Sequence, residues 1–215
     1  MITLCIGNKN YSSWSLRAWL ALRFTGAPFR EEVFDLGAPG IREVIRKRSP
    51  TGRVPALEDG EVRVWDSLAI GEYLAEKFPE AGLWPADSSA RATARSVVAE
   101  MHSGFLDLRR HMPMNVRRSS PGKGRGPGVE ADIERIRSSW RHCRERFGAG
   151  GDFLFGACSL ADCFYAPVVT RFVTYAVELD PPCGAYRDSM LALPAMREWR
   201  SAAERETATD PDYDL

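Results

Sequence analysis

The alternation of short apolar runs with helical stretches in residues 1–78 most constrains how this chain can fold. Residues 2–6 form an apolar run typical of a buried strand. Apolar residues then recur at helical spacing until Gly26, and residues 29–36 form a second candidate strand. Two parallel strands need a long connection between them, and a helix is the usual one. A strand, a helix and another strand in this order therefore indicate a right-handed crossover. The first two strands are therefore predicted to be parallel.

A hairpin is predicted to follow this crossover. Two apolar runs, residues 54–57 and 62–65, flank an Asp-Gly pair, which is a strong hairpin pattern. Asp66 and Ser67 then precede an amphipathic helix, in the position of capping residues. The predicted order is β-α-β-α-β-β-α, so the expected fold class of this part is α/β with a mixed four-stranded sheet.

The chain changes character near residue 80. A connector rich in Pro and Gly spans residues 80–87, and the sequence after it is helical, without strand-like alternation or a repeat. The helices are expected at residues 88–116, 129–147, 160–178 and 187–206. A capping box from Ser159 to Asp162 opens the third of them. We therefore predict a first domain at residues 1–79, a linker at 80–87 and an all-helical bundle domain at 88–215.

Charge and cysteine usage argue against several classes of function. Lys plus Arg and Asp plus Glu both number 29, so the net charge is zero. Since a nucleic-acid coat or an anionic-membrane binder needs surplus positive charge, neither nucleic acid nor a membrane is expected as a partner. No secretory signal or membrane-spanning run is recognisable, and a cytoplasmic protein is expected. The five cysteines form no Cys-x-x-Cys pair and the three histidines have no ligand-like spacing, so we expect reduced thiols and no metal site.

Ser12 and Ser13 lie between the first strand and the first helix, at the carboxyl end of a strand, where ligands of α/β sheets commonly bind. The helix that follows begins with unpaired amides and a partial positive charge, which favour an anion. A hydroxyl at this position can donate a hydrogen bond to that anion. The alternative interpretation is that one of these serines is only the N-cap of the helix.

Two later segments have the chemistry to bind a small peptide. Val54 precedes Pro55 at the start of a strand, and a cis bond there would turn the Val54 amide and carbonyl outward to pair with an extended ligand. Asp66 can face an ammonium, while Ser67 and the free amides of the next helix can hold a carboxylate. Together with the serines, these segments are predicted to converge on one small zwitterionic peptide.

Four segments together resemble the cytosolic glutathione transferases, and most of all the zeta and theta-like bacterial branch, which uses serine rather than tyrosine. In chain order they are residues 12–17 (SSWSLR), 49–57 (SPTGRVPAL), 66–74 (DSLAIGEYL) and 156–162 (GACSLAD). The resemblance spans nearly the whole chain. It implies a thioredoxin-like N-terminal domain, an all-helical C-terminal domain, a homodimer and glutathione as co-substrate.

The resemblance also implies a role for each residue of the site. Ser12 matches the thiol-activating serine, and Ser13 is the competing candidate. The glutathione-binding positions are Arg53, Val54, Pro55, Asp66 and Ser67. In this assignment the Val-Pro segment pairs with the cysteinyl backbone, the Asp-Ser pair holds the γ-glutamyl end, and the arginine faces the glycyl carboxylate or the groove.

An electrophile would bind beside the sulfur, in a groove between the two domains. The side chains predicted to line this groove, each of which could instead belong to the core, are Trp14, Met101, Phe105, Arg109 and Met112, with Met114 near them. Residues 108–129 contain Lys and Arg but no acid, which fits a carboxylate-bearing electrophile or a solvated basic loop. We favour the mobile loop for residues 119–128, because turn and linker residues dominate them.

The leading hypothesis is an enzyme, a glutathione S-transferase that converts the glutathione thiol to a thiolate for attack on an electrophilic small molecule. The alternatives are a related glutathione-dependent peroxidase or zeta-like isomerase, and a non-catalytic glutathione-fold module that binds ligands. Maleylacetoacetate isomerases of the zeta branch have a cysteine where this chain has Trp14, which argues against that specific activity. The physiological electrophile is not predicted.

Overall fold

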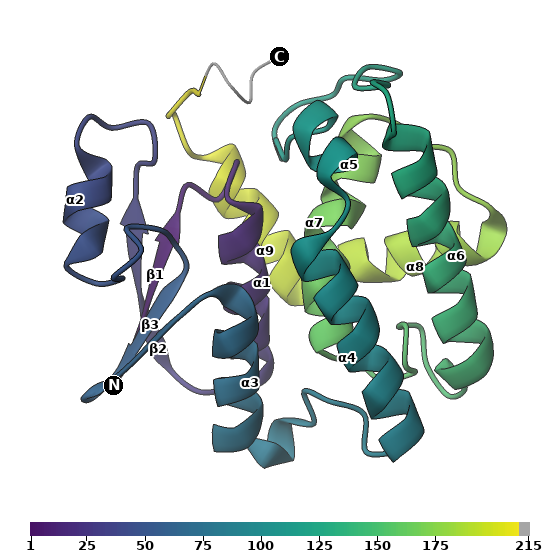
Figure 1. Ribbon diagram of the computed structural model, residues 1–215, viewed down its shortest axis with the longest axis horizontal. Helices are drawn as coiled ribbons and strands as arrows, with labels where there is room; N and C mark the ends of the chain where they lie inside the picture. Colours follow the sequence, from purple (N-terminus) through teal and green to yellow (C-terminus); the bar gives the residue numbers. More distant parts are fainter. Residues whose placement is uncertain (211–215) are drawn as a thin grey trace.

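The computed structural model describes residues 1–210, and its first part is a four-stranded sheet flanked by helices (Figure 1). The strands are β1 (Ile2–Gly7), β2 (Phe29–Phe34), β3 (Ala56–Asp59) and β4 (Val62–Trp65). Their spatial order is β2-β1-β3-β4, with β1 parallel to β2 and β3 antiparallel to both of its neighbours. The predicted crossover, hairpin and mixed sheet are therefore confirmed.

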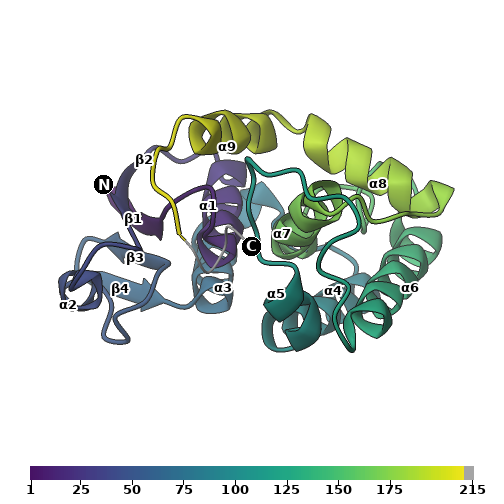
Figure 2. The same ribbon diagram turned by 90° about the horizontal axis from the view of Figure 1, so that it is seen from above.

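Helices cover both faces of this sheet. They are α1 (Ser13–Phe24), α2 (Ile41–Arg46) and α3 (Ser67–Lys77). α1 and α3 lie on the face that is turned toward the rest of the molecule, and α2 lies on the other face (Figure 2). Leu16 and Leu20 on α1 and Ile70 and Leu74 on α3 are fully buried, so the apolar stripes of these helices form the core against the sheet.

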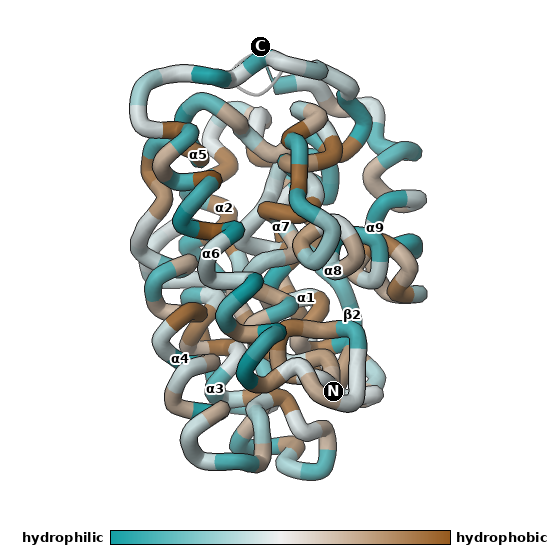
Figure 3. The backbone as a smooth tube through the Cα atoms, turned by 90° about the vertical axis from the view of Figure 1, so that its right-hand side faces the viewer, coloured by the Kyte–Doolittle hydropathy of each residue, from teal (hydrophilic) through white to brown (hydrophobic). Residues whose placement is uncertain are grey.

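The rest of the described chain is helical. After the short 3-10 helix η1 (Pro79–Ala81), the helices are α4 (Ser88–Ser103), α5 (Leu106–His111), α6 (Val129–Phe147), α7 (Leu160–Thr174), α8 (Pro181–Ala192) and α9 (Pro194–Glu204). α7 is buried along nearly its whole length and lies between the other helices of this part (Figure 2). α4 and α6 instead alternate hydrophobic and hydrophilic stretches along the tube in Figure 3, as expected of helices with one buried face.

The predicted capping box at the start of α7 is confirmed. The Asp162 carboxylate accepts a hydrogen bond from the backbone N–H of Ser159 at 2.8 Å, and its other oxygen accepts one from the N–H of Leu154 at 3.1 Å. Asp162 is fully buried. Burial raises the pKa of its carboxyl to about 6, because the charged form loses its hydration.

Two of the predicted helices are broken in the structure. The helix expected at residues 88–116 ends at Ser103, because Gly104 is extended and Phe105 adopts a left-handed φ of 58° before α5 begins. The helix expected at residues 187–206 is instead two helices, separated at Leu193, whose ψ of 130° is extended. Pro194 explains this break, since proline disfavours a helical conformation in the preceding residue and lacks an N–H donor.

The sheet part and the helical part pack directly against each other. α1 contacts both α7 and α9. The Trp199 indole on α9 donates a hydrogen bond to the Lys9 carbonyl at 2.9 Å, and the Glu206 carboxylate accepts bonds from the Lys9 and Asn10 amides. The loop between β1 and α1, which contains the predicted serines, is therefore held by α9 and the segment that follows it. Within residues 1–210, no helix has the length and apolar character needed to cross a membrane.

Candidate active site

Ser12 and Ser13 lie where the chain leaves β1 and enters α1. The backbone N–H of Ser12 donates to the Asn8 carbonyl at 2.9 Å, which closes the turn, and Ser12 is the N-cap of α1. Both serine side chains line the same pocket, although each residue is only 6% exposed. Ser12 is therefore a helix cap that also faces a pocket, so the two interpretations of this residue are compatible.

The hydroxyl of Ser12 belongs to a short chain of hydrogen bonds. The N–H of Gly7 donates to Ser15 Oγ at 3.0 Å, and Ser12 Oγ donates to Ser15 Oγ at 2.7 Å. Each hydroxyl has one hydrogen to donate, so this pair can reverse its direction. In the reversed arrangement Ser15 donates to Ser12, and the hydrogen of Ser12 becomes free to bond an anion in the pocket.

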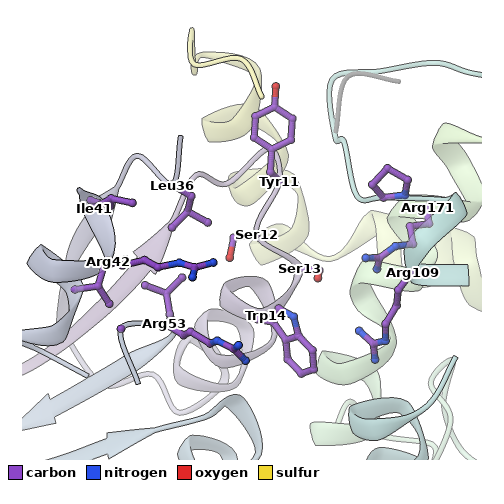
Figure 4. Close-up of a pocket in the computed structure, with 14 residues that line it drawn as sticks. Tyr11, Ser12, Ser13, Trp14, Leu36, Ile41, Arg42, Arg53, Arg109 and Arg171 are labelled. Carbon is purple, nitrogen blue, oxygen red and sulfur yellow. The ribbon is translucent and has the colours of Figure 1, made fainter. Parts of the chain in front are cut away.

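Ser13 has a different environment from Ser12. Its hydroxyl makes no hydrogen bond to any residue in the range 1–210. Figure 4 shows the two serine oxygens on opposite sides of the loop, Ser12 on the side of Arg42 and Ser13 on the side of Arg109. Both serines can therefore donate to an anion, but from different walls of the pocket.

Two adjoining pockets lie at the junction of the two parts of the molecule. The first, of about 370 Å³, we call the arginine pocket, because its lining includes Arg42, Arg53, Arg109 and Arg171, and none of its described lining residues is acidic. The second, of about 670 Å³, we call the Asp66 pocket. Trp14, Arg53 and Val54 line both, so the two pockets form one continuous site.

The structure brings the remaining predicted glutathione-binding residues into the Asp66 pocket. Val54 and Pro55 are joined by a cis peptide bond, and both line it together with Asp66 and Ser67. Asp66 is the N-cap of α3: its Oδ1 accepts from the Leu68 N–H at 2.8 Å. The Ser67 hydroxyl is buried and has no hydrogen-bond partner in the described chain, so it is available to a ligand.

Trp14 lies between two guanidinium groups. The Arg17 guanidinium stacks 4.3 Å from the ring centroid of Trp14, and that of Arg109 lies 4.9 Å from the same centroid. Arg17 is fully buried, and no nitrogen of its guanidinium has a hydrogen-bond partner among residues 1–210. Burial, followed by repulsion from Arg109 and Arg171, lowers the pKa of Arg17 well below its usual value. The four arginines that line the arginine pocket, with no acid among its described lining residues, make that pocket electropositive, and binding of an anion there is favoured.

The structure corrects most of the predicted groove. Trp14 and Arg109 line the arginine pocket, but Met101, Phe105 and Met112 line neither pocket. Met101, Met112 and the neighbouring Met114 have no exposed surface, and Phe105 is 7% exposed. These side chains belong to the hydrophobic core, and the helices around them, α4 and α5, pack against α6 and α7.

Sequence reasoning missed several residues that line the site: Tyr11, Arg42, His102 and Arg171. Arg171 is buried on α7, where its Nε donates to the Met112 carbonyl at 2.7 Å. A buried basic residue within an otherwise apolar helix is an unusual pattern, and this pattern could have identified Arg171. His102 offered no such signal, because it is one polar residue on an amphipathic helix.

No group of three or more His, Cys, Asp or Glu side chains within residues 1–210 is arranged to hold a metal ion. All five cysteines are free thiols in the structure. Burial raises the pKa of the Cys158 and Cys163 thiols at the start of α7 well above the usual range. These two sulfurs are therefore poor nucleophiles and do not contribute to the site.

Comparison with known proteins identifies the family. The family model for the glutathione S-transferase N-terminal domain matches residues 11–77, and that for the C-terminal domain matches residues 126–202. The chain belongs to the glutathione S-transferase family. The predicted enzyme class, the thioredoxin-like domain and the helical domain of these transferases are thereby confirmed, as is the resemblance to the zeta-like bacterial branch.

Similar proteins include members of the zeta class. A glutathione S-transferase zeta class protein from Euphorbia esula is 31% identical over 76% of this chain and 73% of its own. A maleylpyruvate isomerase from Ralstonia sp is 26% identical over 80% of this chain and 86% of its own. Among solved structures, a glutathione transferase homologue from Burkholderia with bound glutathione has a TM-score of 0.72 and 25% identity, and covers 95% of this chain and 99% of that one.

Proposed function

We propose that this glutathione S-transferase binds glutathione across the two pockets, ionises its thiol, and directs the thiolate at an electrophilic small molecule in the arginine pocket. The observation that most supports this proposal is a serine hydroxyl at the N-terminus of α1, in the same pocket as Val54. A thiolate beside Ser12 would receive both a hydroxyl hydrogen bond and the favourable field of the helix.

Each end of the tripeptide has a matching group in the Asp66 pocket. In the proposed pose, the backbone of Val54, fixed ahead of Pro55, pairs with the cysteinyl residue. Asp66 receives the γ-glutamyl ammonium, and the Ser67 hydroxyl at the start of α3 receives the adjacent carboxylate. Arg53 lines both pockets and is assigned to the glycyl carboxylate.

A serine hydroxyl and the N-terminus of α1 can together supply the free energy that ionises the glutathione thiol. A free thiol has a pKa near 8.5, so only a few per cent is thiolate at neutral pH. Lowering this pKa by about two units requires about 2.7 kcal/mol of preferential stabilisation of the anion. A hydroxyl donor contributes about 1.5 to 3 kcal/mol and a helix N-terminus about 0.3 to 1 kcal/mol. We assign the donor role to Ser12, with Ser13 as the competing candidate, and this chemistry uses no metal.

The arginine pocket favours an electrophile that bears a carboxylate. Arg109 and Arg171 line the cavity from the helical part, on the side away from Arg42, and α5 ends in a run of basic residues (Figure 4). A carboxylate bound there would hold the reacting carbon near the sulfur. In conjugation, the thiolate forms a carbon–sulfur bond and either displaces a leaving group or adds to a double bond that then takes up a proton.

A glutathione-dependent cis–trans isomerisation of an unsaturated acid is the second candidate. The same arginines support it, and so does the similarity to the maleylpyruvate isomerase from Ralstonia sp. In this reaction the thiolate adds to the double bond, rotation occurs about the resulting single bond, and the thiolate is expelled unchanged. Trp14 occupies the position at which zeta-branch maleylacetoacetate isomerases have a cysteine. The side chain next to the glutathione sulfur is therefore different in this chain.

The proposal also covers the domain bounds, the oligomeric state, the cellular location and the partners of the protein. We assign residues 1–79 to the glutathione-binding domain, 80–87 to a linker and 88–215 to the helical domain, of which residues 211–215 lie outside the described part. A homodimer follows from the family resemblance. Five free thiols support a reducing, cytoplasmic location, and the balanced charge gives no support for nucleic acid or a membrane as a partner.

The decisive experiment measures the ultraviolet absorbance of the glutathione thiolate in the complex as pH is varied. The proposal expects thiolate at neutral pH, and loss of this absorbance in Ser12→Ala with glutathione still bound. Loss in Ser13→Ala but not in Ser12→Ala would transfer the donor role to Ser13. Failure of glutathione to bind at millimolar concentration would contradict the whole proposal, whereas binding without a thiolate and without turnover would favour the non-catalytic module.

A panel of electrophiles then separates the reaction types. Chloronitrobenzenes and isothiocyanates report conjugation, hydroperoxides report reduction, and maleyl acids report isomerisation. The proposal expects higher kcat/KM for acidic members of the panel than for neutral members of similar reactivity. Equal values for the two groups would contradict the assignment of Arg109 and Arg171 to a carboxylate.

A further inference from the structure

The two carboxylate oxygens of Asp66 have separate partners. Oδ1 is committed to the start of α3, where it accepts from the backbone N–H of Leu68 at 2.8 Å. Oδ2 lies 3.3 Å from Nε2 of His102. Only Oδ2 is therefore free of the helix, and in the proposed function this is the oxygen that an ammonium would approach.

His102 reaches this oxygen from the other part of the molecule. It lies near the end of α4, and it lines the Asp66 pocket together with Asp66 and Ser67. The edge of the Trp14 ring supports the imidazole with a centroid separation of 5.3 Å, and Phe164 on α7 lies 6.1 Å away. The side chain is 24% exposed, compared with 46% for Asp66. His102 is therefore held in one position, while one of its nitrogens faces the carboxylate.

We propose that His102 is a positioning residue for the γ-glutamyl ammonium of glutathione, an inference that rests on the proposed function. In its neutral form His102 presents Nε2 to Oδ2 of Asp66 at 3.3 Å and leaves this oxygen open to the ammonium. In its protonated form it places a cation beside that same oxygen and competes with the ammonium. Glutathione binding and protonation of His102 therefore oppose each other.

The surroundings of His102 favour its neutral form. Burial is the largest influence and lowers the pKa of its imidazole below the usual value. Asp66 at the start of α3 opposes this shift, whereas the cations Arg17 on α1 and Arg109 on α5 add to it. The ligand's ammonium would be one more cation beside the imidazole and would lower the pKa of His102 further. The affinity should therefore be highest at neutral pH and should fall as the pH drops below the ordinary histidine range.

The test uses S-methylglutathione, which keeps the γ-glutamyl group but has no ionisable thiol, so that thiol ionisation does not affect the result. Its dissociation constant is measured by calorimetry from about pH 5.5 to about pH 7.5, where the ligand's ammonium stays charged. For the unmodified protein we expect binding about threefold weaker at the acidic end, because a protonated His102 has to lose its proton before the ammonium can bind beside Asp66. His102→Gln, which keeps a donor beside Asp66 but cannot be protonated, should bind with less than a twofold change over this range. His142→Gln, on the exposed face of α6, is the control and should keep the pH dependence of the unmodified protein.

A second ligand makes the test independent of any variant. The analogue glutaryl-S-methylcysteinylglycine lacks only the ammonium, and its affinity for the unmodified protein should not fall on acidification. The same acid weakening for both ligands, or in both the unmodified protein and His102→Gln, would overturn the role of His102 while leaving glutathione binding intact. If S-methylglutathione and glutathione both fail to bind at every pH, the proposed function itself fails.

Discussion

At the scale of single residues, the Ser12–Ser15 hydroxyl pair determines how strongly Ser12 can donate to a thiolate. Ser15 Oγ already accepts the Gly7 N–H, so once it donates to Ser12 the bonds form a chain in which each strengthens the next. For Ser15→Ala we expect the thiol pKa of bound glutathione to rise by about half a unit to one unit, read from the pH dependence of thiolate absorbance. Ser103→Ala, an exposed serine at the end of α4, is the control. An unchanged thiol pKa in Ser15→Ala would show that Ser15 does not act through Ser12.

The guanidinium of Arg109 allows a prediction about substrate charge. For Arg109→Gln we expect the KM for 4-chloro-3-nitrobenzoate to rise about ten- to hundredfold, because a charge-assisted hydrogen bond contributes about 1.5 to 3 kcal/mol. The KM for the neutral 1-chloro-2,4-dinitrobenzene should change less than twofold. Arg110→Gln is the matched control, since Arg110 is exposed and does not line the pocket. Equal increases for the two substrates would point to a structural effect, because Arg109 also donates to the Gly104 carbonyl.

Prediction from the sequence was most effective where the chemistry of a residue is local. Ser12, Val54 and Asp66 could be singled out because a strand end, a proline and a helix start each leave a pattern of adjacent residues. His102 and Arg171 could not, because their roles depend on α4 and α7 packing against a loop that lies far away in the chain. The direction of the Ser12–Ser15 bond also requires atomic positions rather than sequence.

At the scale of elements, the start of α7 depends on a single buried carboxylate. Asp162 accepts from the N–H groups of Leu154 and Ser159, which would lose their partner on truncation. For Asp162→Ala we expect the free energy of unfolding to fall by about 2 to 4 kcal/mol, since two buried amides become unsatisfied. Urea titration measures this change. Asp152→Ala, an exposed residue just before the same segment, should change it by less than about 0.5 kcal/mol.

The same carboxyl gives a pH dependence with a definite sign. Burial raises the pKa of Asp162 to about 6, above the usual value of an unfolded chain, so the folded state binds this proton more tightly. The stability that this proton provides is complete at low pH and is lost as the pH rises through about 6. Between about pH 5 and pH 7 this loss amounts to about 1 kcal/mol, and Asp162→Asn should remove it from the unfolding profile. An identical pH profile for the unmodified protein and this variant would assign the effect to other groups.

Sequence patterns predict the presence of a helix better than they predict the residue at which it ends. Apolar residues continue at helical spacing across Gly104 and Phe105, so the pattern predicts one helix. In the structure the backbone turns at Phe105, and two helices result. Pro194 was a usable signal for the second break, but an apolar stripe continues across it. The error at Phe105 also explains the misplaced groove, because Met101 and Met112 face the core only once the chain has turned between them.

At the scale of the whole molecule, the site is a property of the junction between the sheet part and the helical part. Trp14 and Arg17 on α1 contact Arg109 and Phe164 of the helical part. Asn10 in the β1–α1 loop donates to the Asn115 side chain at 3.0 Å. Because these contacts involve the same loop and helix that present the serines, separation of the two parts would open the arginine pocket and remove His102 from the Asp66 pocket. The two parts are therefore expected to unfold in one cooperative transition.

The segment after α9 supplies the longest-range contact of this junction and gives the last prediction. The Glu206 carboxylate accepts from the amides of Lys9 at 2.6 Å and Asn10 at 2.9 Å, so it fixes the loop that leads to Ser12. For Glu206→Ala we expect faster hydrogen exchange at residues 9 and 10, and a fall of about 1 to 3 kcal/mol in the free energy of unfolding. Glu204→Ala, at the exposed end of α9, should change neither. In Glu206→Ala, Ser12 would be held less precisely. The kcat of this variant should therefore fall more than its affinity for glutathione, which depends mainly on the Asp66 pocket. Unchanged exchange at residues 9 and 10 would show that the turn closed by Asn8 holds this loop without the C-terminal segment.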